Sequence, residues 1–180
     1  GDVMLYVLDG ENFQTIRKEL IKVRLEEQFN FIKQIPIFAS LDAVAKYNIA
    51  EKITLNEYEE GDKIIDSKMK NTNNDDNNNN NNSTSPSVST TNNNSKHYNN
   101  NHNILFLIKD GCVEVRRQHR KIRELGVNEY FGVEKILFDE LFKSSVNIIA
   151  ICPTTCYQIS KGDLVEALGV NYKDIILLSL

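Results

Sequence analysis

The sequence predicts an α+β protein in which an antiparallel β jelly-roll barrel is flanked by N- and C-terminal helices. Apolar residues between positions 11 and 50 recur every three or four residues, which is the helical period. From position 51 to 159 the period changes to two, and turn residues separate several short runs. Helical spacing returns from 160 to 180. Many short strands at regular intervals are typical of a jelly roll.

The N-terminal part is expected to contain one strand and two helices. Alternating apolar residues predict a strand at residues 1–10, and helical spacing predicts the N-terminal helices within 11–50. Asp9 or Gly10 is expected to cap the first helix, Pro36 to end it, and Ser40 or Asp42 to cap the second.

Turn residues divide the barrel region into strands. Gly61-Asp62 predicts one turn, and Asp110-Gly111 after the apolar run 104–108 predicts a hairpin. A further tight turn is expected at 118–120. Residues 146–151 and 155–159 are expected to form a last strand pair across Pro153.

The C-terminal residues 160–180 are predicted to be helical. Ser160 is expected to cap a helix that stops at Gly169, and a second helix begins near Tyr172. This second helix is apolar on nearly every side, so it needs a partner that the sequence does not contain. Together with the isolated first strand, this indicates a segment of a longer protein.

An asparagine-rich insertion interrupts the barrel region at 67–103. Between Asn71 and Asn103, 16 of 33 residues are Asn and only Val88 and Tyr98 are apolar, so the tract cannot form a core. We interpret it as a disordered, inert insertion. Two of the three histidines, His97 and His102, lie inside it and make a poor metal site.

Composition argues against several classes of function. The net charge of −4 is unlike that of nucleic-acid-binding proteins, and no apolar run is long enough to span a bilayer. Three cysteines, an odd number, indicate a reducing, cytoplasmic setting, and Cys112 and Cys156 are expected to face the core. Outside the Asn tract only His119 remains, so no metal site and no catalytic residues are expected, and a metal-dependent jelly-roll enzyme is rejected.

One stretch carries a specific motif. Residues 125–137 read Leu-Gly-Val-Asn-Glu-Tyr-Phe-Gly-Val-Glu-Lys-Ile-Leu. Gly126, Tyr130, Phe131, Gly132, Ile136 and Leu137 resemble the phosphate-binding cassette of the cyclic-nucleotide-binding domains of cAMP- and cGMP-dependent protein kinases. Residues 60–65 and 106–111 are similar to strands of that fold. Residues 6–41 resemble the junction between two tandem domains, which implies that 1–10 are the end strand of a preceding domain and that 11–50 are a linker with the N-terminal helices. The resemblance implies a short helix after Phe-Gly, a Glu for the ribose and an Arg for the cyclic phosphate.

The sequence departs from this cassette at both charged positions. Val133 stands in the Glu position and Phe142 in the Arg position, while Glu134 and Lys143 each follow one residue late. A shift of one residue turns a helical side chain by about 100°, so Glu134 is expected to point away from the ribose. An alternative register of 139–145 brings Lys143 inward, and Ser144 and Ser145 remain as hydroxyl donors.

The resemblance fits apicomplexan cGMP-dependent protein kinases best, which carry several tandem domains of this kind, one of them degenerate. It implies a non-catalytic regulatory domain that needs no cofactor and relays movement between adjacent cyclic-nucleotide domains and a kinase domain of the same polypeptide. The alternative is a weak but genuine cGMP sensor that uses the helix N-terminus and Lys143. A DNA-binding regulator is disfavoured, because residues 160–180 lack a basic recognition helix.

Overall fold

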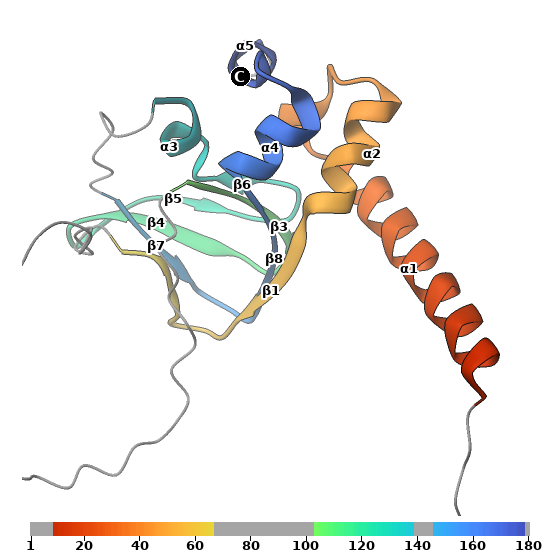
Figure 1. The fold of residues 1–180 in the computed structure, drawn as a ribbon. Helices are drawn as coiled ribbons and strands as arrows, with labels where there is room; N and C mark the ends of the chain where they lie inside the picture. Colours follow the sequence, from red (N-terminus) through yellow and green to blue (C-terminus); the bar gives the residue numbers. More distant parts are fainter. Residues whose placement is uncertain (1–8, 67–102, 139–145, 179–180) are drawn as a thin grey trace, which may run out of the picture.

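Two antiparallel sheets and a layer of helices make up the protein (Figure 1). The structure is a computed structural model, and it describes residues 9–66, 103–138 and 146–178. The predicted strand of residues 1–8 and nearly all of the predicted Asn-rich insertion lie outside the described residues.

Helix α1 (Gly10–Ile32) extends away from the body as an arm (Figure 1). The Asp9 carboxylate accepts a hydrogen bond from the Glu11 N–H at 2.9 Å, which confirms the expected cap. All residues from 11 to 24 are exposed, and packing against the body begins at Leu25. The apolar spacing in the first half of this helix therefore does not mark a face buried within the chain.

The first helix ends earlier than predicted. It stops at Ile32, and Pro36 instead opens the short 3₁₀ helix η1 (Pro36–Phe38), where its missing N–H leaves no hydrogen bond unmade. Helix α2 (Ala43–Lys52) follows, with Asp42 as its cap through a 2.7 Å bond from the Ala45 N–H.

Each sheet has four strands, and every strand pair is antiparallel, which confirms the predicted fold class. The first sheet has the order β1 (Thr54–Tyr58), β8 (Thr154–Ser160), β3 (Ile104–Asp110), β6 (Tyr130–Phe131). The second has the order β2 (Lys63–Ile65), β7 (Val146–Ala150), β4 (Val113–Arg117), β5 (Arg120–Leu125).

Two predicted strand pairings are wrong. Asp110-Gly111 does not close a hairpin, because β3 and β4 belong to different sheets, and β7 and β8 are likewise separated across Pro153. Gly111 has φ +84°, a conformation that occurs both in hairpin turns and in turns that connect two sheets. The local sequence therefore could not distinguish the two kinds of turn. The hairpin β4–β5 is confirmed, with Gln118 at φ 56° in its turn.

Strand β3 is buried on both faces. Leu105 and Leu107 belong to the cluster beneath the helices, whereas Phe106 and Ile108 belong to the cluster between the sheets. This double burial explains why the run 104–108 is continuously apolar rather than alternating.

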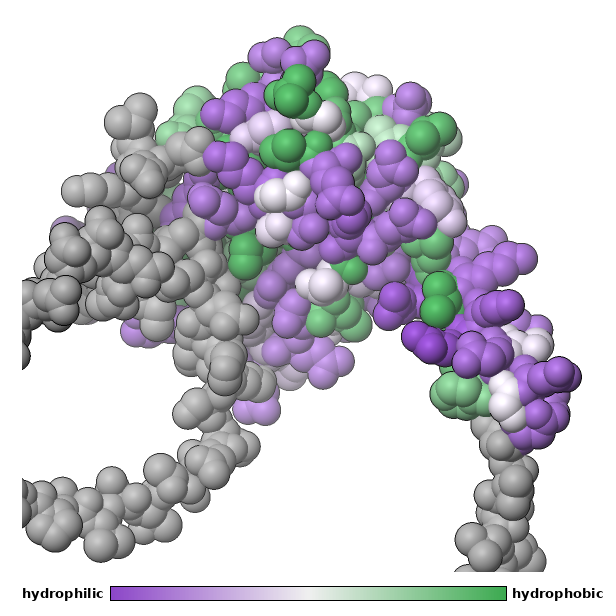
Figure 2. Space-filling model, in the orientation of Figure 1, coloured by the Kyte–Doolittle hydropathy of each residue, from purple (hydrophilic) through white to green (hydrophobic). Residues whose placement is uncertain are grey.

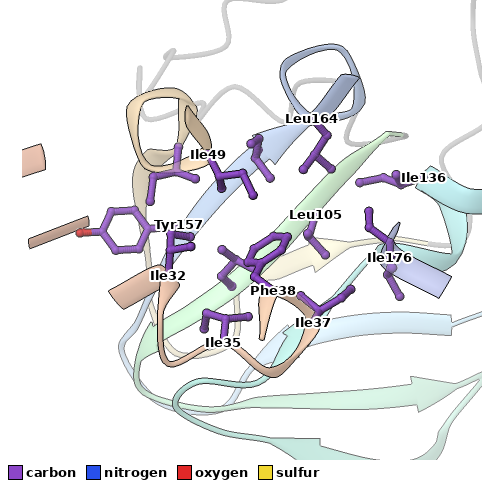
Figure 3. Packing of buried hydrophobic residues seen from close by; sticks show 14 of the residues in the cluster. Ile32, Ile35, Ile37, Phe38, Ile49, Leu105, Ile136, Tyr157, Leu164 and Ile176 are labelled. Atoms are coloured by element: carbon purple, nitrogen blue, oxygen red, sulfur yellow. The ribbon is translucent and has the colours of Figure 1, made fainter. Parts of the chain in front are cut away.

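The cluster beneath the helices covers the first sheet (Figure 3). Its residues come in part from the helices α1, η1, α2, α4 (Lys161–Leu168) and α5 (Tyr172–Leu177). Ser160 caps α4 as predicted, since its hydroxyl accepts from the Asp163 N–H at 3.1 Å. The Lys52 ammonium and the Glu166 carboxylate form a 2.6 Å ion pair between α2 and α4.

The surface is mainly polar on the face shown in Figure 2, and apolar residues stand out toward the end where α5 lies. Val170 and Leu178 are the most exposed large apolar residues of the described chain, at 86% each. Among the described residues, no helix combines the length and the apolar character that crossing a membrane requires.

Candidate functional site

The predicted cassette is anchored to strand β3 by its first turn. The Ile108 N–H donates to the Glu129 carbonyl, and the Asn128 N–H donates to the Ile108 carbonyl, both at 2.9 Å. The Glu129 carboxylate accepts from the Gly126 N–H at 2.6 Å, which closes the turn. Asn128 has φ 68°, a conformation that Asn tolerates better than most residues. Strand β6 follows and pairs with β3.

Phe131 and Gly132 fix the start of the cassette helix. The Phe131 ring stacks on Phe106, with 4.7 Å between ring centroids and 8° between the planes. Gly132 has φ +91°, and a Cβ atom there would collide with the Ile104 carbonyl oxygen. Helix α3 (Val133–Phe138) begins at the next residue, in agreement with the expected short helix after Phe-Gly.

The apolar side of helix α3 faces the cluster beneath the helices. Val133, Ile136 and Leu137 are spaced by three and four residues, are all buried, and belong to the cluster beneath the helices. Glu134 lies on the other side and is exposed, as expected from its position in the helix. Val133 is therefore a core residue, 6% exposed, and not an unused position on an open surface.

Helix α5 packs against the same side of α3. Tyr172 and Ile176 are buried in the cluster that contains Val133, Ile136 and Leu137, and Figure 3 shows Ile176 beside Ile136. The Tyr172 hydroxyl lies 3.5 Å from the Ile136 carbonyl oxygen, to which it donates. This contact joins the C-terminal helix to the cassette.

The charges of residues 126–138, the described part of the cassette, do not favour an anion. Lys135 is the only cationic residue between 126 and 138, and burial lowers the pKa of its ammonium. Two carboxylates, Glu129 and Glu134, lie in the same segment. Burial raises the pKa of the Tyr130 phenol, and the nearby Glu134 carboxylate adds to this increase.

The structure brings together the first six predicted site residues: Phe131, Gly132, Val133, Glu134, Ile136 and Leu137. Phe142, Lys143, Ser144 and Ser145 lie outside the described residues. Sequence reasoning missed the roles of Glu129 and Tyr172. The three-residue spacing of Gly126 and Glu129 could have indicated the turn that the Glu129 carboxylate closes. No local sequence pattern indicates that Tyr172 contacts α3. In the described ranges, no three His, Cys, Asp or Glu side chains form a group that could hold a metal ion.

Comparisons with known proteins agree with this geometry. The regulatory domain of Toxoplasma gondii PKA, solved with cAMP, superposes with a TM-score of 0.66 at 14% identity, covering 94% of this chain and 53% of that one. This is the fold of a cyclic-nucleotide-binding domain. No family model matches the chain.

Two curated relatives to which the chain is similar are cGMP-dependent protein kinases. The Eimeria tenella cGMP-dependent protein kinase is 22% identical over 183 residues, which cover 99% of this chain. The kinase egl-4 of Caenorhabditis briggsae is 27% identical over 158 residues, or 84% of the chain. The chain spans only 15% and 17% of the length of these relatives. It is thus similar to a segment of them and has the fold of a regulatory domain.

Proposed function

We propose that this chain is the degenerate cyclic-nucleotide-binding domain of a cytoplasmic cGMP-dependent serine/threonine protein kinase, and that it relays movement between neighbouring domains without binding cGMP. The observation that carries the proposal is the burial of Val133. The side chain in the position that the resemblance assigns to the ribose-binding Glu is buried, in the cluster that also contains Ile136 and Leu137.

The energetic cost of the missing groups supports a silent cassette. A hydrogen bond to a charged group contributes about 1.5–3 kcal/mol, so replacing both charged residues removes about 3–6 kcal/mol. Since about 1.4 kcal/mol corresponds to a factor of ten, the loss of affinity is roughly 100-fold to 10,000-fold. Between residues 126 and 138 the one cationic side chain is Lys135, and burial lowers the pKa of its ammonium.

The contact between α3 and α5 supports the relay. Tyr172 and Ile176 connect the cassette to the C-terminal end of the domain, while α1 leads away from the body at the other end. A relay requires an element whose position responds to neighbours on both sides. We propose that the partners are the adjacent cyclic-nucleotide domains and the kinase domain of the same polypeptide.

Calorimetric titration of the chain with cGMP, and then with cAMP, up to millimolar concentration tests the silent cassette. We expect no heat of binding and no thermal stabilisation. The matched variant Val133→Glu/Phe142→Arg restores the two charged groups and is expected to gain binding. Because Val133 lies in the core, circular dichroism must first show that the variant folds. Saturable micromolar binding by the unmodified chain would overturn the proposal and favour a true sensor.

The relay is tested in the full-length kinase. Ile176→Ala weakens the contact between α5 and the cassette, and Leu177→Ala is the control because Leu177 is on the exposed side of α5. We expect Ile176→Ala to shift the half-activating cGMP concentration by about fivefold or more, the lower end of typical coupling between sites. Equal activation curves for the two variants would refute the relay.

A further inference from the structure

Two cysteines far apart in sequence face each other where two turns meet. Cys112 follows Gly111 in the turn between β3 and β4, and Cys152 lies in the turn between β7 and β8. Their Sγ atoms are 2.8 Å apart, and both residues are half-buried. The prediction that Cys112 faces the core is therefore wrong. Local sequence patterns could not reveal the pair, because Cys152 lies 40 residues after Cys112.

Several hydrogen bonds hold the two turns together around these thiols. The buried Thr154 hydroxyl lies 3.0 Å from the Cys112 carbonyl oxygen and 2.8 Å from the Cys152 carbonyl oxygen, so both carbonyls are acceptors for its single O–H. It also accepts from the Cys112 N–H at 3.3 Å. The Ile151 N–H donates to the same Cys112 carbonyl at 3.1 Å.

Close packing of the backbone fixes the turns further. A Cβ atom added at Gly111 would lie 2.7 Å from the Thr154 Cα, so the two turns touch through their main chains. The thiols are thus brought together by main-chain contacts between the two turns. A disulfide has an S–S length of about 2.05 Å, so bond formation requires the sulfurs to approach by only about 0.75 Å.

We propose that Cys112 and Cys152 are an oxidation site, at which a peroxide converts the two thiols into a reversible disulfide. The Cys152 thiolate attacks one peroxide oxygen, the O–O bond breaks, and the departing hydroxide takes up a proton as water, which leaves a sulfenic acid. The Cys112 sulfur then attacks the Cys152 sulfur, the S–O bond breaks, and the hydroxide leaves as water with the Cys112 proton. Two thiols and one hydrogen peroxide give one disulfide and two waters.

The geometry separates the reacting pair from the third thiol. The hydrogen bond with Cys152, together with desolvation, raises the pKa of Cys112 to about 11. Cys156 lies in the core between the sheets, and this burial raises the pKa of its thiol to about 12. Cys156 is therefore a bystander and an internal control.

The bond would close a loop that contains the whole candidate cassette. Residues 113–151 include β4 to β7 and α3, so oxidation fixes the base of this loop at a single point. Such a bond stabilises the folded state mainly by restricting the unfolded chain. In a reducing cytoplasm it is expected to be transient, as disulfides with a sensing role are.

Peptide mapping of the chain tests the site. The folded protein is treated with hydrogen peroxide, blocked with iodoacetamide and digested with trypsin. We expect peptide 110–116 to be joined to peptide 144–161, with fragment ions placing the bond at Cys152 and dithiothreitol releasing it. A bond from Cys152 to Cys156, a bond from Cys112 to Cys156, or sulfinic acids without any crosslink would each overturn the proposal.

Thermal unfolding supplies an independent readout. Oxidation is expected to raise the melting temperature by about 5–15 °C in the unmodified chain and in Cys156→Ala. The Cys152→Ser variant keeps a similar side chain but cannot form the bond, so peroxide should leave its melting temperature unchanged. A rise of the same size in Cys152→Ser, or no rise in the crosslinked chain, would contradict the stabilising bond.

Discussion

Gly132 shows how a single residue constrains the cassette. Its φ of +91° is unfavourable for other residues, and its Cα approaches the backbone of β3 so closely that a Cβ would collide with the Ile104 carbonyl. Gly61 has almost the same dihedral, φ +90°, but nothing lies within 4 Å of its Cβ position. A side chain at Gly61 would therefore cause backbone strain alone, whereas a side chain at Gly132 would cause strain and a steric clash with β3.

We predict that Gly132→Ala destabilises the fold by roughly 2–4 kcal/mol, from backbone strain together with the displacement of β3. Gly61→Ala should cost only about 1 kcal/mol, because strain acts there alone. Urea unfolding of both variants measures the difference. Equal losses would show that β3 and the start of α3 are not in close contact.

The burial of Cys156 predicts how the free energy of unfolding depends on pH. An unfolded thiol ionises at about pH 8.5, whereas burial raises the pKa of Cys156 to about 12. Between these values the unfolded chain has lost a proton that the folded chain retains, so the free energy of unfolding falls as pH rises. The slope is about 1.4 kcal/mol per pH unit and is absent below pH 8.

The apolar variant Cys156→Val removes this ionisation. Its free energy of unfolding should therefore approach and then exceed that of the unmodified chain as the pH rises from about 8 to 11. Urea unfolding at several pH values, under reducing conditions, provides the measurement. Parallel curves over this range would mean that Cys156 is accessible to solvent in the folded state.

At the scale of elements, the two terminal helices differ in how they are held. Helix α1 is exposed along 11–24 and packs only near its end, whereas the six-residue helix α5 buries Tyr172 and Ile176 against the cassette side of the core. A helix as short as α5 is unstable alone, so its structure depends on this packing.

We predict that Ile176→Ala destabilises the isolated chain by about 2–4 kcal/mol, since Ile176 is fully buried. Leu177→Ala, on the exposed side of the same helix, should change stability by less than about 0.5 kcal/mol. Urea unfolding compares the two variants. If both have the same small effect, α5 is not docked in solution and cannot transmit movement.

Features that depend on neighbouring residues were predictable from sequence, and features that depend on distant ones were not. The caps at Asp9, Asp42 and Ser160 are local and were anticipated. The sheet crossings at Gly111 and Pro153 were read as hairpins, because a turn does not reveal which sheet its second strand joins. The cassette helix followed from the Phe-Gly motif, but its burial beneath α5 did not.

At the scale of the whole molecule, the predicted insertion separates β2 from β3, which belong to different sheets. We predict that deletion of residues 75–98 leaves the fold intact. Shortening the undescribed stretch 67–102 from 36 to 12 residues (36 − 24) reduces the entropy of loop closure, which should raise the free energy of unfolding by up to about 1 kcal/mol. Urea unfolding and circular dichroism give the comparison. A loss of more than about 2 kcal/mol would show that the tract contributes to the packed structure.

The pairing of β1 with β8, and of β2 with β7, has a consequence for how the protein is made. Thr54 pairs with Gln158, which the ribosome adds 104 residues later (158 − 54). At about 5–20 residues per second, β1 waits about 5–20 s for its partner strand. Helices α1 and α2 are neighbours in the chain and can pack together during this time. Each sheet is completed only after β7 or β8 has been synthesised, so the β-structure is expected to form in a single late step.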